Sequence, residues 1–344
     1  CIIAPISSWA AAVTGFVEGE DGFSIFLRAI PFNYYALLTI LTMVLLVVLK
    51  VDYGSMRVHE DNALRGDIYT TPDRPYADAQ DDVVEEKGGV IDLVFPILVL
   101  IGCCIIGMLY SGGFFSGVSF VEAFSASDAS VGLMLGSFFA FVITVIFYAL
   151  RRVLKFTDSM ACIPDGFKAM VPAILILTFA WTLKAMTDSL GAAEYVAGIM
   201  ETAATGLVNF LPAIIFLVGC FLAFATGTSW GTFGILIPIV VAVFQGTNET
   251  MMIISISACM AGAVCGDHCS PISDTTIMAS AGAQCNHVNH VSTQLPYAMT
   301  VAAVSFVTYV IAGFVQNAWI CLPIGIILMT GTLFVIRAIT GKEE

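Results

Sequence analysis

The sequence predicts an all-α polytopic membrane protein in which some helices break inside the membrane. Of its 344 residues, 58% are hydrophobic and only 11% are charged, and its mean hydropathy is +0.93. A soluble domain carries about 25% charged residues. In addition, polar residues together with glycine or proline interrupt two of the long apolar segments, which predicts irregular backbone within them.

Spanning a bilayer takes about 20 apolar residues in a helix. Segments of suitable length and composition are Pro31–Leu49, Ile91–Tyr110, Val131–Leu150, Ala169–Leu190, Tyr297–Val315 and Trp319–Ile336. The chain also opens in an apolar run up to Phe16, without a methionine or a basic start. We interpret this run as the tail of another helix, in a chain whose N-terminal part is missing.

Basic residues favour the cytoplasmic side of a membrane protein. Lys50, Arg151, Lys168 and Arg337 can all be cytoplasmic at once, which places the C-terminus inside. The same orientation places residues 191–206 and the loop around Asn248 outside.

Much of the net charge of −13 lies in one loop, because residues 51–92 hold 11 acidic and four basic residues. We interpret residues 51–90 as an acidic, solvated cytoplasmic linker. Its charge argues against binding of nucleic acid or attraction to anionic lipid. The ten cysteines form no CxxC pair, so they predict neither a disulfide framework nor a redox motif.

The segment Gly262–Ala283, GAVCGDHCSPISDTTIMASAGA, places two carboxylates inside an apolar region. It predicts a broken helix with one half over Met251–Val264 and the other over Ile272–Ala283. Ser270 is a suitable N-cap and Pro271 a suitable first residue for the second half. Such breaks are tolerated at membrane depth where the backbone lines a cavity or is buried in protein.

Asp267 and Asp274 are the principal candidate binding residues, because ionisable groups inside a membrane are costly and usually functional. Oxygen ligands suit a hard cation such as sodium, and the surrounding hydroxyls belong to Ser270, Ser273, Thr275 and Thr276. The alternative is that the loop lies at the interface and the aspartates only cap helix ends.

The other interrupted segment, Asn209–Phe244, breaks at TGTSWGT, Thr226–Thr232. Its downstream arm, Phe233–Phe244, would be about 18 Å long as a helix, which is short for a span. We therefore predict a re-entrant hairpin whose tip carries Thr228 and Ser229 and faces the broken helix. A surface loop is the alternative. The Ser-Trp pair of this tip also occurs in PISSWAA, Pro5–Ala11, as an inverted repeat would produce.

Two further groups of ionisable residues are candidates for function. Lys184 and Asp188 lie four residues apart, on one helix face, where Lys184 could be a counter-ion or a proton carrier. His287 and His290 could sense pH in a cytoplasmic loop or belong to a plain polar connector. A zinc site could be assembled from these histidines with nearby cysteines and His268, but their spacing matches no zinc motif. No cofactor motif appears in the sequence.

The motifs GTSWGTFGILIP, GDHCSPISDTTIMASAGAQCNHVNHVSTQLPYA, AWTLK and PISSWAA together resemble the NhaC-type sodium/proton antiporter family, within the broader ion-transporter superfamily. The resemblance covers nearly the whole chain. It implies an inverted-repeat transporter with a re-entrant hairpin and a broken helix in each half. It also implies that this chain lacks the first scaffold helices, the first hairpin and most of the first broken helix.

On that pattern the chain divides into five parts. These are the end of the first repeat (1–50), the acidic linker (51–90), scaffold helices (91–190), the transport-domain hairpin and broken helix (207–285) and C-terminal helices (297–337). The resemblance carries a site over to Thr228, Ser229, Asp267, Ser270, Ser273, Asp274 and Thr275. Lys184 is an additional candidate on the grounds given above.

The expected function is exchange of sodium for protons across the cytoplasmic membrane by alternating access, with sodium, protons and the bilayer as partners and a homodimer as the assembly. One alternative keeps the fold but exchanges an organic anion or amino acid; Lys184 is then the only basic residue within a span. A second alternative is an intramembrane hydrolase, for which the spacing displays no nucleophile or metal geometry. A channel is a third, although buried carboxylates at broken helices suit alternating access better.

Overall fold

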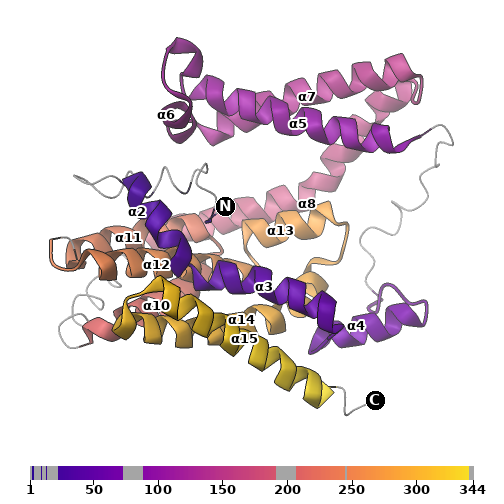
Figure 1. The fold of residues 1–344 in the computed structure, drawn as a ribbon. Helices are drawn as coiled ribbons and strands as arrows, with labels where there is room; N and C mark the ends of the chain where they lie inside the picture. Colours follow the sequence, from indigo (N-terminus) through magenta and orange to yellow (C-terminus); the bar gives the residue numbers. More distant parts are fainter. Residues whose placement is uncertain are drawn as a thin grey trace. The chain divides into compact units, whose positions relative to one another are not determined.

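The structure, a computed structural model, describes residues 2, 3, 9, 13, 22–72, 88–190, 207–244 and 246–340 (Figure 1). Within these ranges the backbone forms α-helices and short 3-10 helices, with no strand. The chain divides into two compact units: residues 78–171 with most of the first twelve residues, and residues 13–77 with 172–344. The predicted all-α architecture is confirmed.

The first unit is a helical hairpin with short appendages. It contains α5 (Val90–Ser111), the 3-10 helix η3 (Phe114–Ser116), α6 (Phe120–Ser125), α7 (Ala129–Arg151) and the start of α8 (Phe156–Ser189). Glycines let the backbones of α5 and α7 approach closely: a methyl group added at Gly136 would lie 2.5 Å from the Cα of Cys104. Small residues serve this purpose in membrane helices generally. Near one end of the hairpin, Arg151 pairs with Asp92 at 3.1 Å.

The second unit contains the remaining described helices. They are α2 (Gly22–Ala29), η1 (Ile30–Phe32), α3 (Tyr34–Leu49), α4 (Ser55–Leu64), η4 (Val208–Phe210), α10 (Leu211–Thr226), α11 (Ser229–Phe244), α12 (Glu249–Cys269), α13 (Asp274–Gly282), α14 (His287–Val315) and α15 (Ala318–Thr340). The predicted span from Pro31 begins instead at Tyr34, because the Asn33 side chain caps α3 by accepting from the Ala36 amide.

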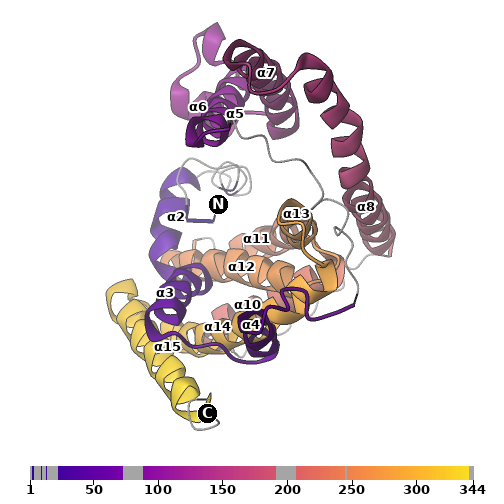
Figure 2. The ribbon, with the colours of Figure 1, turned by 90° about the vertical axis from the view of Figure 1, so that its right-hand side faces the viewer.

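Helix α12 is the centre of this unit. It contacts α2, α3, α10, α11 and α14, and Figures 1 and 2 show these helices around it. Every residue from Met251 to Ala263 is buried, so the helix has no solvent-facing or lipid-facing side over this stretch. A helix that is apolar all round is typical of a membrane-protein core.

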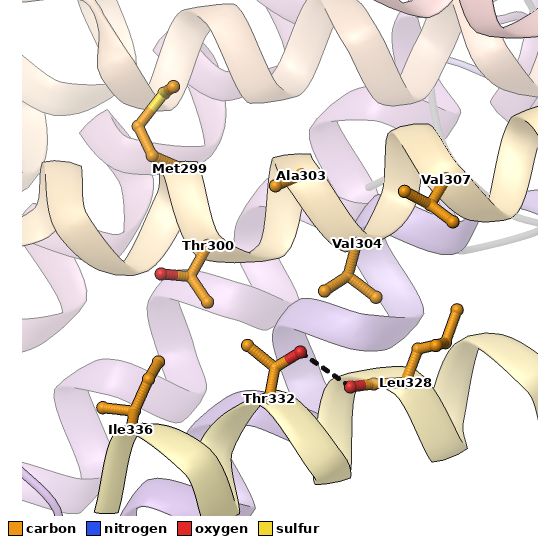
Figure 3. A pocket seen from close by; sticks show the side chains of 8 residues that line it. All are labelled: Met299, Thr300, Ala303, Val304, Val307, Leu328, Thr332 and Ile336. Atoms are coloured by element: carbon orange, nitrogen blue, oxygen red, sulfur yellow. Dashed lines mark hydrogen bonds between the residues drawn. The ribbon is translucent and has the colours of Figure 1, made fainter. Parts of the chain in front are cut away.

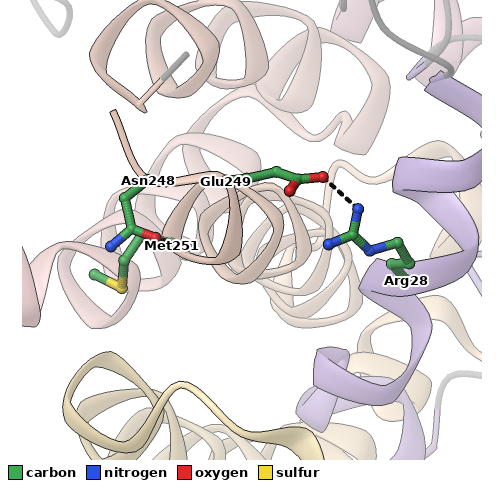
Figure 4. Close-up of polar contacts among 4 residues, drawn as sticks. All are labelled: Arg28, Asn248, Glu249 and Met251. Carbon is green, nitrogen blue, oxygen red and sulfur yellow. Dashed lines mark hydrogen bonds and ion pairs between the residues drawn. The ribbon is translucent and has the colours of Figure 1, made fainter. Parts of the chain in front are cut away.

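Charged and polar side chains mark the start of α12 (Figure 4). The Asn248 side chain caps the helix by accepting from the Met251 amide at 3.0 Å. Glu249 follows and forms an ion pair with Arg28 of α2. Both side chains of the pair are about half exposed, so the pair adds little stability. Glu249 lies in the first turn of α12, at the opposite end of the helix from Asp267.

Glycines also set the distance between α12 and α10. A methyl group added at Gly262 would lie 2.4 Å from the carbonyl oxygen of Phe216 in α10. We expect Gly262→Ala to force the helices apart and to cost about 1–3 kcal/mol of stability. A fall in the melting temperature of the purified protein would measure this. Gly331→Ala is the matched control, since nothing lies within 4 Å of a methyl group there; an equal fall in both variants would contradict the prediction.

The helices account for most of the predicted spans. Six described helices are long and apolar enough to cross a membrane, or seven if α2–η1 and α3, bent by 49° at Asn33, count as one. The chain is therefore a multi-pass membrane protein. Helix α14 begins ten residues before the predicted Tyr297, because Asn286 caps it. The predicted segment Ala169–Leu190 falls in α8 and its end, and many of its side chains, including those of Lys184 and Asp188, lie outside the described residues.

The acidic linker is not simply a solvated connector. Its first part packs on α14: the Tyr53 hydroxyl donates to Thr300 at 3.0 Å, and the Asn289 amide donates to Thr71 at 2.7 Å. Burial raises the pKa of Tyr53 above its ordinary value, in keeping with this docking. Most side chains of residues 51–72 are nonetheless exposed or half-exposed, so these contacts are points of docking within a largely solvated linker. Residues 73–87, the Pro5–Ala11 motif apart from Trp9, and the predicted external loop 191–206 lie outside the described residues.

Candidate functional site

The break after α12 lies at Ser270–Ser273, which we call the α12–α13 linker. Ser270 ends α12, and Ser273 rather than Ser270 is the N-cap of α13, accepting from the Thr276 amide at 3.3 Å. The prediction of Ser270 as N-cap and Pro271 as first helical residue is therefore wrong. The reason is a long-range contact: the Ser270 hydroxyl donates to the Phe224 carbonyl of α10 at 2.8 Å.

Helix α12 is also longer than the predicted half-helix. It runs without interruption for 21 residues, which is about 31 Å and long enough to cross the hydrocarbon core. Asp267 consequently lies in the last turn of a complete helix rather than in irregular backbone. Asp274 is the first residue of α13, where the helix dipole favours a negative charge.

Asp267 is the buried carboxylate of the site, with 2% of the residue exposed. Its Oδ2 accepts from the Thr275 hydroxyl at 2.7 Å, and that hydroxyl also lies 2.8 Å from the Ser273 hydroxyl. Its Oδ1 has no hydrogen-bond partner among the described residues. A buried charge without full compensation is unfavourable, so this oxygen is a natural place for a cation or a proton.

Asp274 differs from Asp267 in its surroundings. It is half-exposed, and its Oδ1 accepts from the amide of the next residue, Thr275, at 2.8 Å. The two carboxylates lie close enough for their charges to interact. The structure therefore brings them to one break but buries only Asp267.

The tip between α10 and α11 packs against the same linker. Gly227 ends α10 in a left-handed conformation, φ +66°, and a methyl group there would lie 2.6 Å from the Ile272 carbonyl oxygen. This agrees with the predicted hairpin whose tip faces the broken helix. The downstream arm is longer than predicted, however, because α11 begins at Ser229 and has 16 residues.

The two candidate residues of the tip lie at the start of α11. Thr228 is half-buried, and its hydroxyl accepts from the Gly231 amide at 3.4 Å. Ser229 is buried. The hydrogen bond of Thr228 thus caps its own helix, while the contact that joins tip and linker comes from Gly227 and, one turn earlier, from the Phe224 carbonyl.

Sequence reasoning missed two side chains that hold the end of α12. The Tyr35 hydroxyl of α3 lies 3.1 Å from Nδ1 of His268, and the Gln294 amide of α14 donates to the His268 carbonyl at 2.7 Å. The sequence does contain a signal for Gln294, since it is a polar residue just before the apolar segment predicted from Tyr297. Tyr35 gave no comparable signal, because an aromatic residue in a membrane helix is ordinary.

The zinc alternative concerns His268, His287 and His290 with nearby cysteines. Within the described ranges, no group of three or more histidine, cysteine, aspartate or glutamate side chains is arranged to hold a metal ion. The zinc alternative weighed from the sequence thus finds no support there.

A cavity of about 530 Å³ between α14 and α15 is a different kind of site (Figure 3). Two of its lining residues carry hydroxyls, Thr300 and Thr332, and the rest are apolar. Thr332 donates to the Leu328 carbonyl of its own helix at 2.8 Å. Its lining contains no carboxylate, so it offers no negative charge to balance that of a cation. The candidate carboxylates Asp267 and Asp274 lie elsewhere, on either side of the α12–α13 linker.

The helices place the chain among polytopic membrane proteins, and the buried Asp267 beside a hydroxyl-rich break is a candidate site for an ion. The comparisons with known proteins specify it further: residues 1–314 match the family model described as the Na+/H+ antiporter family, and the chain belongs to that family. The resemblance found in the sequence is confirmed. The family is one of transporters rather than enzymes, so the hydrolase alternative is not supported.

Three relatives place the chain among longer proteins. It is 35% identical over 334 residues to an uncharacterized protein of Haemophilus influenzae, covering 92% of this chain and 62% of the relative. It is 26% identical over 168 residues to the Malate-2H(+)/Na(+)-lactate antiporter of Bacillus subtilis, covering 47% and 34%.

A third relative, an uncharacterized Na(+)/H(+) antiporter of Haemophilus influenzae, is 29% identical over 164 residues, covering 46% of this chain and 33% of the relative. The chain thus spans less than two thirds of the length of each of these proteins. No solved structure matches it.

Proposed function

We propose that this protein exchanges sodium for protons across the cytoplasmic membrane by alternating access, with Asp267 as the residue that both cations share. The observation that carries the proposal is the state of this carboxylate: it is buried, and only one of its oxygens has a hydrogen-bond partner. Family membership supports sodium and protons as the exchanged ions. Assembly as a homodimer remains a prediction.

Competition at one carboxylate is sufficient for exchange. The negative charge of Asp267 is compensated once, either by a proton on an oxygen or by a sodium ion that also uses nearby hydroxyl oxygens. Ser273 and Thr275 supply such hydroxyls beside the carboxylate. The proposed contributors also include Asp274, Ser270, Thr228 and Ser229. These residues would reach the Asp267 carboxylate only if the tip or the linker moved. Lys184 remains a proposed counter-ion or proton carrier on α8.

Thr275 tests the proposed site without changing any charge. Thr275→Val keeps the shape of the side chain but removes the hydroxyl that donates to Asp267. We expect the KM for sodium to rise by about ten-fold, which is the effect of losing a hydrogen bond to a charged group. Thr275→Ser keeps the hydroxyl and is expected to retain most of the affinity. An unchanged KM in Thr275→Val would remove this hydroxyl from the site.

Exchange of an organic anion is the second candidate. It is favoured by the relative whose name includes malate and lactate, to which about half of this chain is similar. The α12–α13 linker and the tip carry no lysine or arginine to bind a carboxylate. The N-termini of α11 and α13 could contribute, because a helix N-terminus attracts anions.

Proteoliposomes with a pH-sensitive dye inside would distinguish sodium/proton exchange from organic-anion exchange. A proton gradient is imposed, and sodium chloride, sodium malate or sodium lactate is added outside at equal sodium concentration. Dissipation of the gradient by sodium chloride alone supports exchange of sodium for protons. If only malate or lactate dissipates it, the cargo is an organic anion and our proposal is wrong in its substrate. Empty liposomes control for leakage.

A further inference from the structure

Three cysteines from distant parts of the sequence meet beside α12. Cys265 and Cys269 lie one turn apart on α12, and Cys220 lies on α10. The thiol of Cys265 makes side-chain hydrogen bonds with the thiols of both other residues. All three are free cysteines. The close approach of α10 and α12 brings them together, since a methyl group added at Gly266 would collide with the Cys220 carbonyl.

These thiols line a cavity of about 380 Å³ between α10, α12 and α14. Its lining also includes the thioether of Met299 on α14, and the remaining lining residues are apolar. Phe221 and Met299 are 71% and 55% exposed, so the cavity is open on their side. Cys265 and Cys269 are buried, whereas Cys220 is half-buried. The cavity is thus lined by four sulfur atoms, with Cys265 as its most buried thiol.

The chemistry of this lining differs from that of the candidate site for sodium. Thiolate and thioether ligands select soft metal ions such as Cu+, whereas oxygen ligands suit hard cations. Structural zinc takes four ligands, but among the described residues no group of three or more histidine, cysteine, aspartate or glutamate side chains is arranged to hold a metal ion. Two neighbouring thiols with a thioether in the same cavity therefore suit an ion that needs only two or three sulfur ligands.

The charge balance at the cavity favours a monovalent ion. When such an ion binds, one thiol loses its proton and its sulfur bonds to the metal, while a second sulfur donates as a neutral ligand. One proton leaves, and the complex has no net charge. An uncompensated charge is costly in an apolar environment, so a neutral complex suits this lining.

We propose that this sulfur-lined cavity binds one soft monovalent metal ion, Cu+ or Ag+, with Cys265 as the thiolate ligand and Cys220 as the second ligand. Cys220 is preferred to Cys269 because it is half-buried and so connects the buried thiol with the open side of the cavity. The bound ion ties α10 to α12 at a position two residues before Asp267. The inference does not rest on the proposed function, because the sulfur ligands are separate from the oxygen ligands proposed for sodium.

Silver is the probe for this site, because Ag+ shares the charge and the sulfur preference of Cu+ and is not oxidised by air. The purified full chain is incubated with silver nitrate and excess glutathione and then desalted, and the silver retained per chain is measured by elemental mass spectrometry. Glutathione removes silver from single thiols. A site with two sulfur ligands retains it, because the second ligand acts at a high effective concentration. Cys103 and Cys104 offer no such pair, since adjacent residues of a helix do not face each other.

We expect the wild type to retain about one silver ion per chain, and Cys220→Ser and Cys265→Ser to retain at least about ten-fold less. Cys321→Ser is the matched control, because Cys321 is a buried thiol of the same unit that lies on α15, outside this cavity. We expect its silver content to equal that of the wild type. A wild type that retains no silver would overturn the inference, and so would an equal loss in Cys321→Ser.

Cys269→Ser tests which two helices the ion joins, and we expect it to keep most of the silver. Loss of silver in Cys269→Ser with retention in Cys220→Ser would place both ligands on α12 and contradict the inference. Because Cys220 is half-buried, its serine variant remains informative if Cys265→Ser does not fold, and silver retained by it at the wild-type level is a negative result for the proposal. The measurement does not involve transport, so a failure of sodium/proton exchange in proteoliposomes would be recognised separately.

Discussion

Asp267→Asn is expected to abolish sodium-dependent proton movement in proteoliposomes, with a loss of at least about 100-fold, while the protein still inserts and folds. Asparagine has nearly the shape of aspartate and can keep the hydrogen bond with Thr275. Asparagine is uncharged, however, so it cannot be neutralised by a proton and a sodium ion in turn. A loss of an interaction with a buried charge is worth about 3–5 kcal/mol, which corresponds to more than a hundred-fold.

Glu249→Gln is the matched control for this substitution. It removes a carboxylate from the same helix, α12, at the opposite end and with about half of its side chain exposed. We expect its activity to stay within about two-fold of wild type, because exposed ion pairs contribute about 0–1 kcal/mol. Substantial exchange by Asp267→Asn would refute the assignment of this residue. In that event Asp274→Asn would be the next variant to measure.

Gly227→Ala is expected to reduce exchange by more than about ten-fold and to lower the melting temperature. Two effects act together at this position. The left-handed conformation, φ +66°, costs a residue with a side chain about 1–2 kcal/mol. The added methyl group would also lie 2.6 Å from the Ile272 carbonyl oxygen, so the linker that follows Asp267 must shift.

Gly246→Ala separates these two effects. Gly246 has a similar conformation, φ +74°, but nothing lies within 4 Å of a methyl group there. We expect a comparable conformational penalty and activity within about two-fold of wild type. The difference between the two variants then measures the contact between tip and linker. Equal activities would show that this contact does not matter for exchange.

Local sequence signals identified the candidate residues of the site, whose role in binding stays a prediction. Asp267, Asp274, the adjacent hydroxyls and the hydroxyls of the hairpin tip stand out in the sequence, because polar residues inside apolar segments are rare and expensive. The start of α13 was predicted at the wrong serine. Ser270 and Ser273 are equally good caps by residue type, and only the bond of Ser270 to the distant Phe224 carbonyl decides between them.

The contact between His287 and the α12–α13 linker shows the same limit. Its partner Pro271 lies 16 residues away, and no residue pattern connects the two. The docking of residues 51–72 on α14 was missed for a related reason. A high density of charge predicts a solvated segment, whereas Tyr53, Thr71 and Asn289 make specific contacts that composition does not reveal.

The sequence by itself determined the class of this protein, the approximate positions of its helices and the segments that carry the candidate site residues. Membrane helices must satisfy their own backbone hydrogen bonds and present apolar side chains to lipid over their full length, so each leaves its signal in consecutive residues. Only the tertiary structure decided that Asp267 is buried while Asp274 is half-exposed, and that Tyr35, Gln294 and His287 hold the end of the site. Burial and these contacts depend on which helices surround α12, and that arrangement is formed by residues far apart in the chain.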